Sequence, residues 1–143
     1  MIQILTHNVT ETEQAGGQLA SRLSPGAVVA FTGDLGAGKT AVCRGFLHAL
    51  GYTGRVTSPT FAIVNEYETE LCRVCHFDMY RILDEDALYD IGWDDYFDGD
   101  TILLVEWSEN VSGAMPEDCI TVDIRRGEAE DDRIITIKGG ELH

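Results

Sequence analysis

The chain has 143 residues, 44% of them hydrophobic, and a formal net charge of −15 from 10 basic and 25 acidic side chains. This length suits a single domain, residues 1–143, and the hydrophobic content excludes a disordered chain. No apolar run approaches the roughly 18 residues of a membrane span, the N-terminus lacks the segments of a signal peptide, and the negative charge repels nucleic acid and anionic lipid. We therefore expect a cytoplasmic protein that makes no membrane contact. If tRNA or DNA takes part in its function, we expect other proteins to hold it.

The first third of the chain alternates strands and helices. Its predicted elements are, in order, a strand at residues 2–5, a helix from Thr10 or Thr12 to Leu23, a turn at 25–26, a strand at 27–31 and a helix at 41–50 that Gly51 ends. Two acids near the start of the first helix suit the positive end of its dipole. The run at 27–31 is apolar throughout, which favours a parallel strand buried on both faces.

The rest of the chain contains more strand than helix. Predicted in order are a loop at 57–60, strands at 61–67 and 71–77 joined by a turn near Glu68-Thr69, a short acidic helix at 83–91, an apolar strand at 101–105, and an antiparallel pair at 120–124 and 133–138. Ser58 and Thr60 in the loop are either turn formers or sensors of a γ-phosphate. This mixture indicates an α/β fold with a mixed, mainly parallel central sheet flanked by helices.

Residues 33–40, between the apolar strand and the following helix, match the Gly-x-x-x-x-Gly-Lys-Thr phosphate-binding loop in full. The loop N–H groups and the positive end of the helix attract phosphate. Lys39 brings a mobile charge to the β- and γ-phosphates, and Thr40 places a hydroxyl on Mg²⁺. The expected nucleotide contacts here are Asp34, Leu35, Gly36, Ala37, Gly38, Lys39 and Thr40. The chain is therefore predicted to be a P-loop NTPase domain that binds ATP with Mg²⁺.

Two acids at strand ends complete the expected site. Glu106 ends a wholly apolar strand, where a second Mg²⁺ ligand is expected, with an ordinary strand-end acid as the alternative. His76 and Asp78 share one face of their strand. Asp78 is a candidate to orient or deprotonate the attacking water, or to hold a Mg²⁺-bound water. Trp107 is expected either to line the site or to belong to the core.

Four cysteines are expected to be reduced thiols: Cys43, Cys72, Cys75 and Cys119. The string from Cys72 to His76 matches a haem c attachment site, and one C-x-x-C pair is a weak indication of zinc. Such haem is attached outside the reducing cytoplasm, and the same residues suit a strand. We therefore expect no haem and no zinc.

Four strings, in order, resemble the TsaE (YjeE) family, the ATPase component of bacterial tRNA threonylcarbamoyladenosine synthesis. They are residues 33–40, Ser58-Pro59-Thr60-Phe61, His76-Phe77-Asp78-Met79-Tyr80-Arg81 and Val105-Glu106-Trp107. The similarity extends from about Thr10 to Arg133 and is loose in the last third. Met79 stands where the family usually has leucine, a change that conserves volume.

The resemblance implies roles and partners. Thr40 and Glu106 would be Mg²⁺ ligands, Asp78 would serve hydrolysis, and Thr12 would lie near the adenine. Arg133 as a nucleotide contact is a guess from the loosely matching part. The implied partners are a threonylcarbamoyl transferase and its paralogous companion subunit, whose cycling on tRNA would be supported by ATP use.

Three functions remain open: an ATPase that is slow alone and stimulated by partners, a non-hydrolysing ATP-dependent switch, and a small-metabolite kinase. The chain has only two lysines and no arginine-rich lid segment, which disfavours a kinase. It also lacks the guanine-reading string Asn-Lys-x-Asp, which disfavours a GTPase. Residues 84–100 contain eight acids and no Lys or Arg. That stretch is either a solvated face or a docking surface for a basic partner.

Overall fold

The computed structural model describes residues 1–33, 38–57, 64–80, 82 and 86–139. Its elements are β1 (Ile2–Thr6), α1 (Val9–Ala20), β2 (Val28–Gly33), α2 (Lys39–Ala49), β3 (Val64–Glu68), β4 (Arg73–Asp78), α3 (Ala87–Asp90), the 3-10 helix η1 (Trp93–Tyr96), β5 (Ile102–Glu106), the 3-10 helix η2 (Ser108–Ala114), β6 (Ile120–Arg126) and β7 (Arg133–Lys138). In this part of the chain, no helix is long and apolar enough to cross a bilayer.

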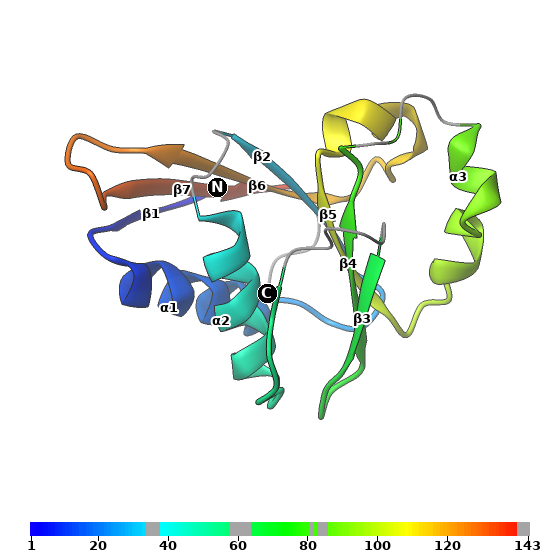
Figure 1. Cartoon of the computed structure of the whole chain (residues 1–143), viewed down its shortest axis with the longest axis horizontal. Helices are drawn as coiled ribbons and strands as arrows, with labels where there is room; N and C mark the ends of the chain where they lie inside the picture. Colours follow the sequence, from blue (N-terminus) through cyan, green and yellow to red (C-terminus); the bar gives the residue numbers. More distant parts are fainter. Residues whose placement is uncertain (34–37, 58–63, 81, 83–85, 140–143) are drawn as a thin grey trace.

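The described strands form one seven-stranded sheet in the order β1-β7-β6-β2-β5-β4-β3 (Figure 1). The three central pairings, β6 with β2, β2 with β5 and β5 with β4, are parallel. The pairings of β1 with β7, β7 with β6 and β4 with β3 are antiparallel. The expected mixed α/β sheet is therefore confirmed, with its parallel pairing concentrated at the centre.

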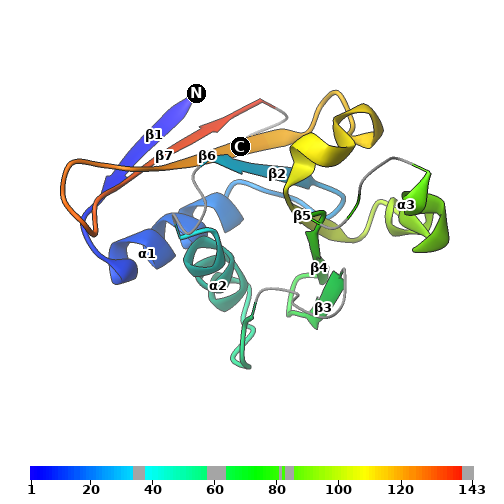
Figure 2. The ribbon, with the colours of Figure 1, turned by 45° about the horizontal axis from the view of Figure 1, so that its top comes forward.

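Helices cover both faces of the sheet. The two long helices, α1 and α2, lie side by side on one face, while α3 lies across the sheet from α2 (Figures 1 and 2). Alternate residues of β5 point to opposite faces: Leu104 packs in the core under α1 and α2, and Leu103 and Val105 pack in the core that includes Trp93 and Val111 from the 3-10 helices. Burial on both faces explains why the sequence of β5 is apolar throughout.

Two glycines let α1 and α2 approach each other closely, which sets the position of the N-terminus of α2. A Cβ atom on Gly16 would collide with the carbonyl oxygen of Val42, and one on Gly45 would collide with that of Glu13. The Arg44 guanidinium also pairs with the Glu13 carboxylate at 2.9 Å. The tight contact holds α2, and with it the residues that begin this helix, against α1.

Three details differ from the sequence expectations. The N-cap of α1 is Asn8, whose side chain accepts a hydrogen bond from the N–H of Glu11, and neither Thr10 nor Thr12 has this role. The same helix ends at Ala20, before the predicted Leu23. Two 3-10 helices, η1 and η2, occupy segments for which no helix was predicted, because their sequences lack an apolar period.

Candidate functional site

The carboxyl ends of three neighbouring parallel strands, β2, β5 and β4, meet at one edge of the sheet. Asp78 and Glu106 are direct neighbours in the register of β4 and β5, and Phe31 of β2 is the partner of Glu106 on its other side. In open α/β sheets, ligands bind outside this edge. The sequence-predicted acids Asp78 and Glu106 therefore lie together where a ligand is expected.

Helix α2 begins at this edge. Its N-cap, Gly38, has φ 104° and ψ 22°, a left-handed conformation that favours glycine. Because Gly38 has no side chain to cap the helix, the N–H groups of the first turn are left for another acceptor. Lys39, the first residue of α2, is only 8% exposed, and Thr40 beside it is half-buried. This arrangement fits a bound phosphate.

Several residues predicted for this region lie outside the described part of the chain. They are the phosphate-loop residues Asp34, Leu35, Gly36 and Ala37, the loop residues Ser58, Pro59, Thr60 and Phe61, and Arg81. Their roles stay predictions.

Trp107 links Lys39 to the strand-end acids. The Lys39 Nζ lies 5.3 Å from the centroid of the Trp107 ring, within the range of a cation–π contact. The ring also packs on Tyr80 at a centroid distance of 4.9 Å. Trp107 has φ 58°, and among the described residues it is the only non-glycine with a positive φ. Such a strained conformation is common at functional sites. The ring also packs against the core that contains Val105 and Val111, so Trp107 contacts the core, and its role in lining the site stays a prediction.

Glu106 is nearly buried and bonded to His76. The His76 Nε2 lies 2.7 Å from Oε2 of Glu106 and 3.8 Å from the Sγ of Cys43. Burial opposes protonation of the imidazole, but the neighbouring Cys43 sulfur and Glu106 carboxylate outweigh burial and raise the pKa of His76 well above its usual value. The pair of Glu106 and His76 was not foreseen from the sequence, because the two residues are 30 positions apart.

Asp78 lies closer to the solvent than Glu106. Its side chain is half-buried, and Oδ1 accepts a hydrogen bond of 2.9 Å from the N–H of Tyr80. The N–H of Met79 donates to the carbonyl oxygen of Glu106, which ties the two strand ends together. An acid held at a strand end and accessible to solvent can hold a water molecule by a hydrogen bond or accept a proton from it.

Thr12 and Arg133 both lie close to Gly38, the N-cap of α2. A Cβ on Gly38 would lie 3.5 Å from Cγ2 of Thr12 and 4.0 Å from Nε of Arg133. The Thr12 hydroxyl bonds with that of Thr6 at 2.8 Å and donates to the carbonyl oxygen of Asn8. Both residues named by the resemblance, Thr12 and Arg133, therefore lie next to the end of the phosphate loop.

The donors present fit Mg²⁺ only together with a nucleotide. No group of three or more His, Cys, Asp or Glu side chains suited to a metal occurs among the described residues. Mg²⁺ is usually bound by one or two protein oxygens, water and substrate phosphates, so a protein cage is not required. Thr40, Glu106 and phosphate oxygens would make such a set.

The C-x-x-C string divides between the surface and the core: Cys72 is partly buried just before β4, and Cys75 lies in the core. Cys75 and His76 are fully buried in β4, and their side chains point to opposite faces of the sheet. Burial raises the pKa of the Cys75 thiol to about 12, which disfavours the thiolate that a metal would need. The expected strand is confirmed as β4, which begins at Arg73 and so leaves Cys72 outside it.

Comparisons with known proteins identify the family. The family model described as "Threonylcarbamoyl adenosine biosynthesis protein TsaE" matches residues 6–135. The chain belongs to the TsaE family. It is 40% identical over 131 residues to the "tRNA threonylcarbamoyladenosine biosynthesis protein TsaE" of Bacillus subtilis, covering 92% of this chain and 81% of the relative. Its identity to the Haemophilus influenzae protein of the same name is 46% over 97 residues, 68% of this chain and 61% of that one.

A solved structure supports the same assignment. The crystal structure of Bacillus subtilis YdiB superposes with a TM-score of 0.81 at 34% identity, covering 96% of this chain and 84% of that one. The family match contains Thr12, Lys39, Asp78, Glu106 and Arg133. The resemblance stated from the four strings is therefore confirmed, and this chain is a member of a family of tRNA threonylcarbamoyladenosine biosynthesis proteins.

Proposed function

We propose that the chain is the ATP-binding and ATP-hydrolysing component of the tRNA threonylcarbamoyladenosine machinery, acting in the cytoplasm as one domain, residues 1–143. Membership of the TsaE family supports the pathway. The observation that carries the ATPase chemistry is the buried Lys39 at the glycine-capped start of α2, 5.3 Å from the ring that follows Glu106. A buried cation beside helix N–H groups that no N-cap side chain accepts from suits a bound anion.

In this proposal each residue has a defined task. Lys39 holds the β- and γ-phosphates, and the adjoining loop N–H groups of Asp34, Leu35, Gly36, Ala37 and Gly38 bind them. Thr12 and Trp107 contact the rest of the nucleotide. Thr40 and Glu106 would hold Mg²⁺, which, when bound, neutralises charge on the phosphates. Asp78 orients the attacking water and accepts its proton.

The proposed partners are a threonylcarbamoyl transferase and its paralogous companion subunit, with tRNA reached through their complex. The net charge of −15 supports this arrangement, because it opposes direct binding of tRNA. Few cations are available to neutralise transition-state charge, since the chain has only 10 basic side chains. We therefore expect slow hydrolysis by the isolated protein and acceleration by partners that close the site or supply a missing group.

The test is phosphate release from ATP by the purified protein, alone and with the transferase pair and tRNA. Slow release that the partners accelerate supports the proposal. Tight ATP binding without phosphate release in any mixture would instead identify a binding switch, and transfer of the phosphoryl group to a metabolite would identify a kinase.

A further inference from the structure

The His76 side chain touches Glu106 but has no task in the proposed chemistry. Its ring is completely buried, and Glu106 retains 7% exposure. An ionised carboxylate can only accept hydrogen bonds, so the hydrogen in the 2.7 Å contact belongs to Nε2, which donates to Oε2 of Glu106.

A role in packing alone does not explain this histidine. Val74 lies on the same face of β4 as His76, and Leu104 is the register partner of His76 on β5. Both are fully buried and apolar. The Nδ1 of His76 has no hydrogen-bond partner in the part of the chain that the structure describes. Burying a polar atom without a partner is unfavourable, so an apolar side chain would stabilise this position better. What only the imidazole supplies is the Nε2–H on Glu106.

We propose that His76 is a positioning residue that holds the Glu106 carboxylate in the orientation required of a Mg²⁺ ligand. The proposal rests on the metal role given to Glu106 above. The geometry supports it because His76 lies one same-face position before Asp78, the register partner of Glu106, so its ring reaches Glu106 from inside the core. Hydrogen bonds to an ionised group are short and strong, and such donors behind a metal ligand tune metal affinity.

The experiment measures the affinity of Mg²⁺ for the complex of protein and ADP by calorimetry, and the affinity of ADP in excess EDTA. His76→Leu removes the donor and keeps the core filled, and His76→Gln restores an amide donor. We expect His76→Leu to weaken Mg²⁺ binding by about 10-fold or more, to leave metal-free ADP affinity near the parent value, and His76→Gln to recover most of the loss.

Two further variants separate positioning from packing. Cys43→Ala changes the other neighbour of the same nitrogen, at 3.8 Å, and should leave Mg²⁺ affinity unchanged. Glu106→Gln should weaken Mg²⁺ binding, and adding His76→Leu to it should cause no further loss, because His76 acts through Glu106.

The outcomes distinguish the two proposals. If Glu106→Gln weakens Mg²⁺ binding and His76→Leu only lowers the unfolding temperature, positioning is overturned and the metal role stands. If Glu106→Gln keeps the parent Mg²⁺ affinity, both fall, and a parent protein that binds no ADP overturns the proposed function itself. Should His76→Leu not fold, His76→Phe is the reserve variant, with the same expected loss of Mg²⁺ affinity.

Discussion

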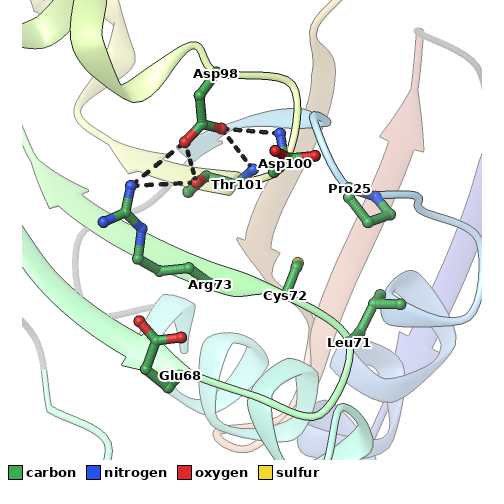
Figure 3. A pocket seen from close by; sticks show the side chains of 8 residues that line it. All are labelled: Pro25, Glu68, Leu71, Cys72, Arg73, Asp98, Asp100 and Thr101. Atoms are coloured by element: carbon green, nitrogen blue, oxygen red, sulfur yellow. Dashed lines mark hydrogen bonds and ion pairs between the residues drawn. The ribbon is translucent and has the colours of Figure 1, made fainter.

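The two ends of the central parallel strands both carry charged side chains, but they arrange them differently. At the amino ends of β4 and β5, a cavity of about 480 Å³ opens to the solvent (Figure 3). It is lined by Pro25, Glu68, Leu71, Cys72, Arg73, Asp98, Asp100 and Thr101. Arg73 pairs with Asp98 at 3.5 Å and with Glu66 at 3.3 Å. Asp98 also accepts hydrogen bonds from the N–H groups of Asp100 and Thr101. Arg73 and Asp98 thus both have ion-pair or hydrogen-bond partners within the protein.

At the carboxyl ends, a cation and a carboxylate are buried, and the Glu106 carboxylate is paired with the buried His76. Lys39 and Glu106 are both at least 90% buried, and the contact that Lys39 makes with Trp107 is to an aromatic ring. Trp107 has a left-handed backbone, and Nδ1 of His76 has no partner among the described residues.

The difference supports the proposal that the ligand binds at the carboxyl end. Exposed ion pairs contribute little to stability, and each partner at the amino end already has another. The carboxyl end contains the strained backbone of Trp107 and, within the described residues, the unpartnered Nδ1 of His76. Both are unfavourable for folding, and such features are typical of functional sites.

The largest effect should come from removing the buried cation. Lys39→Ala should weaken ATP binding by about 10²-fold or more, because each charge-assisted hydrogen bond contributes roughly 1.5–3 kcal/mol and two phosphates are contacted. Calorimetric titration gives the affinity. Lys138→Ala is the matched control, since Lys138 is the other lysine and is exposed on β7. Equal affinities in the two variants would remove Lys39 from the site.

The same change at each end tests the catalytic acid. Asp78→Asn should retain ATP binding, because the phosphate contacts remain, while single-turnover hydrolysis in the full complex falls by about 10²-fold, the usual scale for a positioned acid or base. Asp98→Asn changes an acid at the amino end that is paired with Arg73, and this variant should hydrolyse ATP at the parent rate. A parent rate for Asp78→Asn would make Asp78 structural.

Much of the carboxyl end could be predicted from the sequence. The apolar runs that became β2 and β5 show burial on both faces, so the acid that follows such a run falls at the sheet edge. The phosphate-loop string ends at the start of α2, as predicted. Local pattern was sufficient for these elements because each has a strong apolar period or a motif.

What could not be predicted depends on tertiary contacts. The bond between His76 and Glu106 requires the neighbouring order of β4 and β5, which no local pattern specifies. The close approach at Gly16 and Gly45 depends on how two helices pack. The left-handed backbone of Trp107 contradicts local preference, because bulky residues avoid it.

The strain at Trp107 gives a smaller, separable effect. Trp107→Gly and Trp107→Ala both remove the ring, but only glycine adopts φ 58° without a steric penalty. The left-handed region costs other residues about 1–2 kcal/mol, and glycine loses roughly 0.5–1 kcal/mol in entropy on folding, so the glycine variant should be more stable by about 0.5–1 kcal/mol. Urea unfolding measures the difference. A more stable alanine variant would show that no strain is stored there.

The smallest effect should be the pH dependence of the amino-end network. The N–H of Asp100 lowers the pKa of Asp98 from its usual 3.8; burial opposes this effect, and Thr101 and the Arg73 charge lower the pKa further. A carboxyl whose pKa is lower in the folded state stabilises the fold above its unfolded pKa, and that contribution is lost as the pH falls through the folded value. Asp98→Asn removes the ionised acceptor, so the gap in urea midpoint between parent and variant should be constant from pH 7 to about pH 5 and should narrow below about pH 4. Because Asp98 is exposed to solvent, the gap should also shrink in high salt. A gap that widens on acidification would mean that Asp98 is not stabilised as a carboxylate, and the amino end would then resemble the strained carboxyl end more than these contacts indicate.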